Sequence, residues 1–363
     1  MRIAQVAPLY ESVPPKLYGG TERVVSYLTE ELVRLGHEVT LFASGDSVTS
    51  ARLETGCKKA LRLTRACIDP LAHHTVMLDK VLSVADRFDV LHFHTDYAHF
   101  PATRGLQLPT VTTLHGRLDL PDLATLYEHF DREPLVSISQ SQRQPLGRVN
   151  WVGNVYHGLP VNSYRPEPRH DGYLAFLGRI SPEKRPDRAI RIAVQAGKKL
   201  KIAAKVDDVD RQYFETQIKP LLDQPGVEFL GEINEGQKNE FLGRAYAYLF
   251  PIDWPEPFGL TMIEAMACGT PTIAFRCGSV PELIDDGVTG FIVESEEEAV
   301  KAVNRVDNLS RARCRATFER RFTSYRMAKD YLSIYRALTE HSPLASHSMH
   351  ISSTVLSSDA ALT

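Results

Sequence analysis

A chain of 363 residues is longer than a typical single domain and long enough for two domains, each with its own hydrophobic core. The hydrophobic content of 43%, the charged content of 24% and the net charge of −3 exclude a strongly basic protein, so we expect no nucleic-acid partner. The five cysteines, odd in number and without metal-ligand spacing, indicate reduced thiols and a cytoplasmic protein. We expect neither a signal peptide nor a transmembrane segment, because no apolar run reaches about 18 residues.

The first half of the chain alternates short apolar runs with helical stretches, which is typical of a parallel sheet covered by helices. Its predicted strands span residues 2–7, 39–43, 90–94, 110–114 and 135–138. A helix over residues 22–35 carries an apolar face and ends at Gly36, a common helix cap. Prolines and polar residues in 158–172 indicate an interdomain linker, and we place the first domain at residues 1–165.

The same alternation restarts at Tyr173, so residues 166–324 are predicted to form a second α/β domain. Its predicted strands span residues 173–177, 200–204, 227–230, 246–250, 272–275 and 291–293. An amphipathic helix is expected over residues 325–340. Residues 341–363 lack a usable period, and we interpret them as a disordered tail.

The stretch Glu-Pro-Phe-Gly-Leu-Thr-Met-Ile-Glu-Ala-Met-Ala-Cys-Gly-Thr-Pro at 256–271 sets two glutamates around the predicted start of a short helix. The unpaired N–H groups of the first helical turn, between Gly259 and Thr261, would attract phosphate. Glu264 lies one turn further in and would favour hydroxyl groups, whereas Glu256 precedes the helix on a proline-stiffened loop. A ligand with a sugar, a diphosphate and a ribose would satisfy all three groups.

Two cations follow the strand predicted over residues 173–177. Arg179 comes directly after that strand, and Lys184 lies in the turn that follows. Both could stabilise the negative charge that develops on a diphosphate leaving group, without a metal ion. The residues alone also allow a solvated basic turn, since further arginines follow.

These stretches together resemble the signature of the retaining nucleotide-sugar glycosyltransferases of family 4, which have the GT-B fold. The Glu-x7-Glu spacing of 256–271 follows Gly-Arg-Ile-Ser-Pro-Glu-Lys at 178–184 and precedes Gly-Ser-Val-Pro-Glu at 278–282 and Asp-Gly-Val-Thr-Gly-Phe at 286–291. Pro-Ile-Asp-Trp at 251–254 is similar to a bacterial branch that includes a glycosyltransferase of avilamycin biosynthesis. The resemblance extends from the first residue to about residue 340. It implies two Rossmann-like α/β domains with parallel sheets facing across a cleft, and a last helix that crosses back to the first domain.

The resemblance also implies roles for residues of the second domain. Glu256 would contact hydroxyls of the donor sugar, and Glu264 would bind the ribose diol. Arg179 and Lys184 would stabilise the leaving diphosphate. The remaining members of the expected donor site are Phe258, Gly259, Leu260, Thr261 and Lys205. Lys205 replaces a glycine-rich turn of the family, so it could reach phosphate or base, or be a surface lysine.

Four positions of the first domain complete the expected site. His115 follows a predicted strand and could hydrogen bond a sugar hydroxyl, and the family carries a histidine at this place. Gly19 and Gly20 precede the first long helix and, by the resemblance, would touch donor phosphate or acceptor, although an ordinary turn also explains two glycines. Asp96 would touch the acceptor.

His92 and His94 share one face of a predicted strand, because side chains alternate with period two. A metal pair is conceivable, but no third ligand has suitable spacing, so we interpret both as packing or cleft-lining residues and expect no metal site. His157 is expected to end the last strand of the first half, where the family often carries asparagine.

The prediction is a metal-independent, retaining hexosyltransferase that moves a sugar from a nucleoside diphosphate sugar to a hydroxyl of a glycan, glycolipid or small metabolite. No cofactor beyond the donor substrate is expected, and peripheral association with a membrane surface stays open. The alternatives are a catalytically silent sugar-nucleotide-binding subunit and a nucleotide-sugar epimerase or phosphorylase of similar architecture. An epimerase would need its own acid and base carboxylates, and a phosphorylase would need a pyridoxal-phosphate lysine motif, which is not found.

Overall fold

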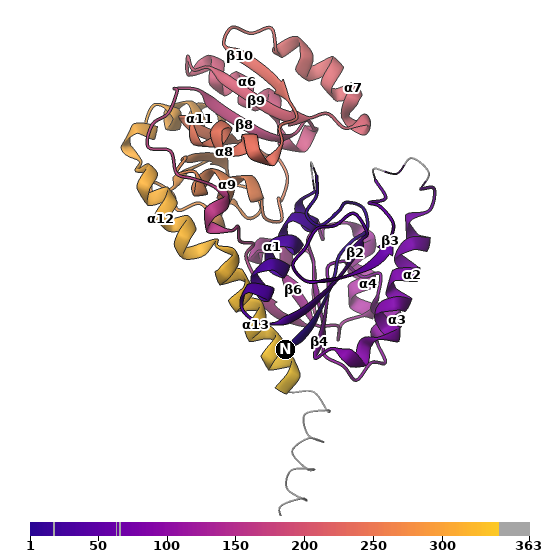
Figure 1. Ribbon diagram of the computed structural model, residues 1–363. Helices are drawn as coiled ribbons and strands as arrows, with labels where there is room; N and C mark the ends of the chain where they lie inside the picture. The colour runs from indigo at the N-terminus through magenta and orange to yellow at the C-terminus, as the bar shows by residue number, and fades with distance from the viewer. Residues whose placement is uncertain (17–18, 63, 65–66, 341–363) are drawn as a thin grey trace, which may run out of the picture. The chain divides into compact units, whose positions relative to one another are not determined.

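The computed structural model describes residues 1–16, 19–62, 64 and 67–340, so the tail expected at 341–363 lies outside the described residues. The chain forms two compact α/β units (Figure 1). Unit 1 consists of Met1–Ser137, Leu146–Val155 and the residues from Met327 on, and unit 2 consists of Ile138–Pro145 and Tyr156–Arg326. The segment expected as a linker, 158–172, groups with unit 2, where Leu159 forms a β-bridge with Thr323.

Unit 1 is built on a seven-stranded parallel sheet with the order β3-β2-β1-β4-β5-β6-β7. Its strands are β1 (Arg2–Val6), β2 (Glu38–Ser44), β3 (Arg52–Cys57), β4 (Val90–Phe93), β5 (Thr110–Thr113), β6 (Leu135–Ser137) and β7 (Trp151–Asn154). Its helices are α1 (Gly20–Arg34), α2 (Pro70–Ser83), α3 (Phe100–Thr103), α4 (Pro121–His129) and most of α13 (Ser324–Glu340). The strand order runs outward from β1 on one side and from β4 on the other, so the topological switch point lies between these two strands.

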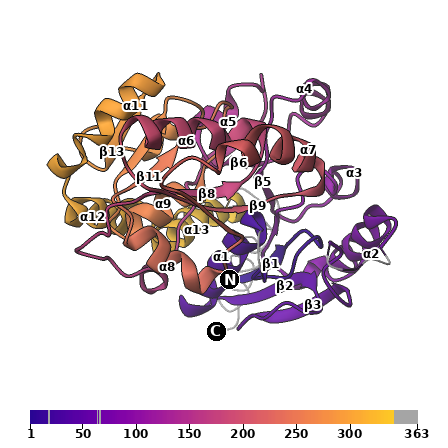
Figure 2. The same ribbon diagram turned by 90° about the horizontal axis from the view of Figure 1, so that it is seen from above.

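The two faces of this sheet differ in character, because successive side chains of a strand point to opposite sides. One face is apolar and packs on α2 through a cluster that includes Ala4, Val6, Leu91, Phe93, Met77 and Val81. The opposite face carries Gln5 and His92, and both contact Tyr335 of α13. Figures 1 and 2 draw α1 and α13 on the side of the sheet opposite to α2. The α13 face therefore buries polar side chains that need hydrogen-bond partners.

Unit 2 is built on a six-stranded parallel sheet with the order β10-β9-β8-β11-β12-β13. Its strands are β8 (Leu174–Arg179), β9 (Leu200–Lys205), β10 (Val227–Gly231), β11 (Ala247–Phe250), β12 (Thr272–Phe275) and β13 (Gly290–Val293). Its helices are α5 (Gln140–Arg143), α6 (Pro186–Gln195), α7 (Arg211–Tyr213), α8 (Glu235–Gly243), α9 (Leu260–Ala267), α10 (Val280–Leu283), α11 (Glu296–Val303) and α12 (Arg311–Arg321). The switch point of this sheet lies between β8 and β11.

The predicted strands of both halves are present, with ends that differ by at most two residues. Strand β3, at one edge of the first sheet, was not predicted, and for β7, at the other edge, only an end was expected. Residues of β3 are mostly polar and partly exposed, so they carry little hydrophobic period. The expectation that His157 ends the last strand of this half is wrong, because β7 ends at Asn154 and His157 packs on Phe258 of unit 2 with ring centres 4.7 Å apart.

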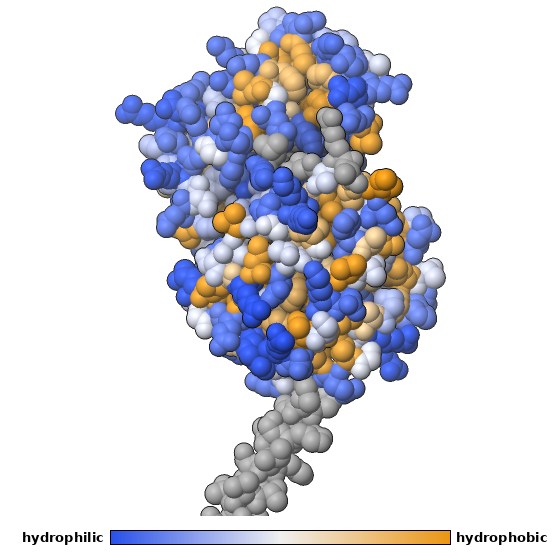
Figure 3. Space-filling model, turned by 45° about the vertical axis from the view of Figure 1, so that its right-hand side comes forward, coloured by the Kyte–Doolittle hydropathy of each residue, from blue (hydrophilic) through white to orange (hydrophobic). Residues whose placement is uncertain are grey.

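The five cysteines are free thiols in the structure. Within the described part of the chain, no helix combines the length and the apolar run that crossing a bilayer requires. Figure 3 shows polar and apolar residues interspersed on the face that it presents.

Candidate functional site

The candidate site of unit 2 lies at the carboxyl ends of β8 and β11. These two strands are neighbours in the sheet and flank its switch point, where open α/β sheets bind ligands. Arg179 is the last residue of β8, and the loop from Pro251 to Gly259 leads from β11 into α9. Topology therefore brings the Arg179–Lys184 turn and the Glu256 loop to the same edge of the sheet.

Glu256 is held by a cation and an indole. The Nζ atom of Lys184 contacts Oε2 of Glu256, and Nε1 of Trp254 donates to the same oxygen at 3.0 Å. The Lys184 ammonium also lies 5.0 Å from the ring centre of Trp254 and 5.8 Å from that of Phe250. Side-chain exposures of 17% for Lys184 and 13% for Glu256 show that this pair is largely shielded. The structure therefore brings together the two predicted residues Lys184 and Glu256 in one geometry.

The Glu256 loop rests on the stretch from Gly278 to Ser279. The backbone N–H of Ser279 donates to the Glu256 carbonyl at 3.0 Å, and its hydroxyl donates to the Phe258 carbonyl at 2.6 Å. Gly278 has φ of +55°, and a Cβ atom there would collide with the backbone of Glu256. A glycine is therefore required at this position by conformation and by space.

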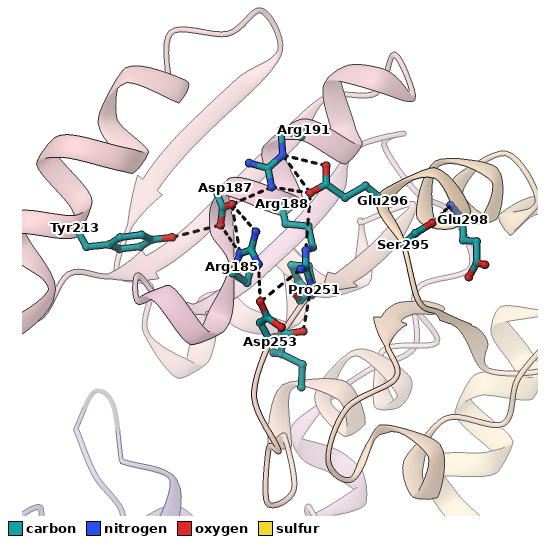
Figure 4. A network of polar contacts seen from close by, with 11 residues as sticks. Arg185, Asp187, Arg188, Arg191, Tyr213, Pro251, Asp253, Ser295, Glu296 and Glu298 are labelled. Carbon is teal, nitrogen blue, oxygen red and sulfur yellow. Dashed lines mark hydrogen bonds and ion pairs between the residues drawn. The ribbon is translucent and has the colours of Figure 1, made fainter.

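A network of arginines and carboxylates holds the segment that follows β11 (Figure 4). Asp253 contacts Arg185 at 2.6 Å and Arg188 at 3.6 Å, and Arg188 donates to the Pro251 carbonyl at 3.1 Å. Arg191 of the same helix pairs with Glu296 of α11 at 2.6 Å. The sequence alone allowed these arginines to be solvated surface residues. In the structure their contacts connect α6 with α11 and with the Pro251–Asp253 segment.

Helix α9 begins as predicted. Gly259 occupies the N-cap position with φ of +83°, and no side chain caps the first turn. Leu260 is the first helical residue, and Thr261 lies with its hydroxyl 2.7 Å from that of Tyr248. Phe258 is 2% exposed, so the structure places this predicted donor residue in the interior.

Glu264 is buried, with 2% exposure. Its Oε1 atom accepts from Nζ of Lys238 at 2.9 Å, and Lys238 also lies 3.1 Å from Glu235. Burial lowers the pKa of Lys238, but the two carboxylates more than offset this effect and raise it above its ordinary value. The Oε2 atom of Glu264 has no hydrogen-bond partner among the described residues, so this oxygen can accept from a ligand hydroxyl. The sequence indicated Glu264 but not Lys238, which lies on another helix.

Arg179 and Lys205 form a second group of charges. Their Cα atoms are partners in the β8–β9 pairing. Arg179 contacts Glu183 at 2.5 Å, Asp210 at 3.4 Å and Asp207 at 3.9 Å, and Lys205 contacts Asp207 at 2.8 Å. Arg179 therefore lies among carboxylates, whereas Lys184 lies on Glu256, and the two predicted leaving-group cations have different partners.

The carboxylate of Glu282 is held by backbone N–H groups and a hydroxyl. Its carboxylate accepts from the N–H groups of Gln140 and Ser141, each at 2.7 Å, and from the Tyr156 hydroxyl at 3.0 Å. Ser139, the N-cap of α5, donates to the Pro257 carbonyl at 2.6 Å. These contacts fasten residues 138–145 to the Glu256 and Gly278 loops of unit 2. Sequence reasoning missed Ser139 and Tyr156, since more than 100 residues separate them from their partners.

The predicted residues of unit 1 lie near the carboxyl ends of β1, β4 and β5. Nε2 of His115 lies 2.9 Å from Nδ1 of His94, and the Asp96 carboxylate accepts from the His115 backbone N–H. Gly19 is the N-cap of α1 and Gly20 its first residue, and a Cβ atom at Gly19 would come within 2.7 Å of Pro15. The structure thus brings His115 and Asp96 together at the switch point of the first sheet.

The pair His92 and His94 is a packing pair. Their ring centres are 4.0 Å apart, and His92 is fully buried with its two ring nitrogens 2.6 Å from the Tyr335 hydroxyl and 2.7 Å from that of Thr113. Both ring nitrogens of His92 therefore have protein partners, in agreement with the interpretation as packing residues. No cluster of three or more potential metal ligands occurs within the described ranges.

Both units are parallel α/β sheets with polar residues at their switch points, where open sheets of this kind bind ligands at the carboxyl ends of strands. The family model for glycosyltransferase family 4 matches residues 18–152, and that for glycosyl transferases group 1 matches residues 164–321. The chain belongs to these glycosyltransferases and has the GT-B fold that its sequence predicted.

Relatives and solved structures agree with this assignment. The chain is 27% identical over 329 residues to a phosphatidyl-myo-inositol mannosyltransferase of Mycolicibacterium smegmatis, with 82% of each chain covered. Among solved structures, AviGT4, a glycosyltransferase involved in avilamycin A biosynthesis, superposes with a TM-score of 0.73, 22% identity and coverage of 94% of this chain and 98% of that one. HepE of Anabaena, in complex with UDP and glucose, superposes with a TM-score of 0.71, 19% identity and coverage of 93% and 100%.

Proposed function

We propose that the protein is a retaining, metal-independent glycosyltransferase that uses a nucleoside diphosphate sugar and a hydroxyl acceptor. The observation that carries this proposal is the Lys184–Glu256 pair in front of α9, with the buried carboxylate of Glu264 one turn inside the same helix. These groups suit three successive parts of one donor: hydroxyls of the sugar, the diphosphate and the ribose diol.

The donor would bind along unit 2 in that order. Glu256 accepts hydrogen bonds from the sugar, while Lys184 and the N–H groups at Leu260 and Thr261 face the diphosphate. Glu264 accepts from a ribose hydroxyl through Oε2 while Lys238 holds its other oxygen. HepE, whose structure contains UDP and glucose, has a similar fold and supports the choice of a nucleotide sugar.

The chemistry follows from charge and geometry. The bond between the anomeric carbon and the diphosphate oxygen breaks, and Lys184 stabilises the charge that develops on that oxygen. The acceptor hydroxyl attacks the anomeric carbon on the same face, and its proton passes to the leaving phosphate oxygen. No enzyme base is needed for this step, so Glu256 positions and stabilises the sugar rather than taking that proton.

Arg179 and Lys205 supply a second pair of cations, which are bound to carboxylates in the structure. Arg179 now lies among Glu183, Asp207 and Asp210. A diphosphate would compete with these carboxylates for the guanidinium, so we assign Arg179 a supporting role behind Lys184. In unit 1, His115, Asp96, Gly19 and Gly20 are proposed to contact the acceptor or the donor phosphate.

The test is a transfer assay with UDP-, GDP-, ADP- and TDP-sugars, with and without a chelator. Because a relative is named for phosphatidyl-myo-inositol, inositol and its phospholipid are the first acceptors. We expect transfer with one nucleotide class, unchanged by the chelator, and a product whose first-formed anomer has the donor's configuration. Glu256→Gln should reduce transfer by at least about 100-fold, and the exposed control Glu228→Gln should retain it.

Three results would contradict the proposal. Inversion at the anomeric carbon would exclude the same-face step. Loss of transfer with chelator would exclude metal independence. Equal activity of Glu256→Gln and the Glu228→Gln control would remove Glu256 from the site.

A further inference from the structure

A chain of hydrogen-bonded polar side chains runs through the interior of unit 1 and ends at His115. Nε2 of His115 lies 2.9 Å from Nδ1 of His94, and Nε2 of His94 lies 2.8 Å from Oε1 of Gln5. Nε2 of Gln5 donates to the Tyr335 hydroxyl at 3.0 Å, and that hydroxyl lies 2.6 Å from Nδ1 of His92. Gln5, His92 and Tyr335 have no exposed surface, and His94 is 2% exposed. These hydrogen-bonded side chains are therefore shielded from solvent within unit 1.

Donors and acceptors can be assigned along this series of hydrogen bonds in only two ways. A neutral imidazole has one N–H, and the single hydrogen of the buried Tyr335 hydroxyl needs an acceptor, so Tyr335 donates to either His92 or Gln5, and this choice fixes the hydrogen bonds that follow. If Tyr335 donates to His92, it accepts from the amide nitrogen of Gln5, and the amide oxygen of Gln5 then faces His94. If His92 donates to Tyr335 instead, the Gln5 amide must be reversed and every following donor changes.

The distances distinguish the two directions. Hydroxyl donors make shorter hydrogen bonds than N–H donors do. The contact of 2.6 Å between Tyr335 and His92 fits the hydroxyl as donor, and the contact of 3.0 Å between Gln5 and Tyr335 fits the amide N–H as donor. Burial also raises the pKa of Tyr335 well above its ordinary value, so its hydroxyl keeps its hydrogen. Tyr335 thus donates to His92 and accepts from Gln5.

The remaining hydrogens follow from this direction. The Gln5 oxygen can only accept, so His94 donates from Nε2 and its Nδ1 atom is an acceptor. His115 must then donate from Nε2 to Nδ1 of His94. The side chains that make up the chain include no carboxylate that would hold a positive charge on these rings, and burial lowers the pKa of His115 to about 3. His115 is therefore a neutral imidazole with its hydrogen on Nε2.

We propose that Gln5 and Tyr335, acting through His94, fix the tautomer of His115 so that Nδ1 carries the lone pair. Nδ1 of His115 is buried in the structure, so a sugar hydroxyl that reaches it on binding would meet a hydrogen-bond acceptor and not a donor. Gln5, His94 and Tyr335 are positioning residues, because they act on the ligand only through His115. The consequence for transfer rests on the proposed function, whereas the tautomer itself does not.

Nitrogen NMR of the histidine rings tests the tautomer directly. In the full chain labelled with ¹⁵N-histidine, two-bond correlations distinguish protonated from unprotonated ring nitrogens, and His115→Gln assigns the His115 signals. Tyr335→Phe removes the hydroxyl that orients Gln5. Tyr331→Phe is the matched control, because Tyr331 is equally buried one turn earlier in α13 and its hydroxyl contacts Thr113, beyond His92.

The wild type and the Tyr331→Phe control should both show a single His115 tautomer, protonated at Nε2. Tyr335→Phe should show a mixture, and its kcat/KM for transfer should fall with the competent population, about twofold for a one-to-one mixture. A wild-type spectrum with Nδ1 protonated would overturn the proposal even if Tyr335→Phe failed to fold. An unchanged tautomer in a folded Tyr335→Phe variant would overturn it as well. Absence of transferase activity alone would instead count against the proposed function.

Discussion

The stability of unit 1 should fall as the pH drops below about 6.5, because folding buries neutral histidines. His99 is 1% exposed, stacks on Phe93 with ring centres 3.8 Å apart, and contacts the Thr112 hydroxyl at 2.9 Å. Burial lowers the pKa of His99 to about 3. The unfolded chain has an ordinary histidine pKa of about 6.5, so acid protonates the unfolded state first. The stabilisation is present above about pH 6.5 and is lost progressively toward pH 3.

The size of this effect follows from linkage. Between about pH 8 and pH 5, a histidine with pKa near 3 when folded and near 6.5 when unfolded costs about 2 kcal/mol of unfolding free energy. Burial also lowers the pKa of His92 well below its ordinary value, so His92 adds to the loss with the same sign. His115, with its pKa lowered to about 3, acts in the same direction, whereas burial raises the pKa of Asp96 to about 6, which favours folding on acidification, so about 2 kcal/mol is the share of His99 alone.

Urea unfolding at several pH values measures this loss. The chain has two tryptophans, Trp151 in unit 1 and Trp254 in unit 2, so Trp254→Phe leaves a fluorescence reporter of unit 1 alone. In that background, His99→Phe keeps an aromatic ring on Phe93 and should remove about 2 kcal/mol of the pH dependence. The exposed His129→Gln should leave the dependence unchanged. A pH dependence that is the same with and without His99 would refute the reasoning.

Three further changes test the site. Lys184→Ala should lower kcat for transfer by about 100-fold or more, because it removes the cation beside the leaving group, and steady-state kinetics measures this loss. Gly278→Ala should destabilise unit 2 by about 1–3 kcal/mol and slow transfer, because φ is +55° there and an added Cβ atom would collide with the backbone of Glu256. The control Gly287→Ala, with φ of +71° but open space around the added Cβ atom, should slow transfer little. Equal kinetics of the two variants would refute the argument. Glu282→Ala leaves two backbone N–H groups and one hydroxyl without their acceptor and should cost about 1–3 kcal/mol in urea unfolding followed by Trp254; an unchanged midpoint would contradict this role.

The sequence predicted those parts of the site whose signal is local. Helix α9, its glycine start and the placement of Glu256 and Glu264 follow from residues within one short stretch, and the structure has them as expected. The Lys184–Glu256 contact joins residues far apart in the chain and was not predicted, although both residues were expected in the site; parallel strands bring the two segments to the same edge of the sheet.

The parts that were not predicted depend on distant partners. Nothing near Arg179 in the sequence indicates that Asp207 and Asp210 would lie beside it, because the β8–β9 pairing decides that contact. Gln5 and Tyr335 are 330 residues apart, and neither has a local pattern that indicates a hydrogen bond. Strand β3 was missed because edge strands with polar residues lack the hydrophobic period that marks buried strands.

Donor binding followed by Trp254 fluorescence tests the central claim most directly. In Trp151→Phe, the remaining indole donates to Glu256 and should respond when a nucleoside diphosphate sugar reaches that carboxylate. We predict a saturable change with one nucleotide class, unaffected by a chelator, and an affinity about tenfold weaker in Glu264→Gln, which loses a charged acceptor for the ribose. A response that is absent for every donor, or undiminished in a folded Glu264→Gln variant, would contradict the account of the site.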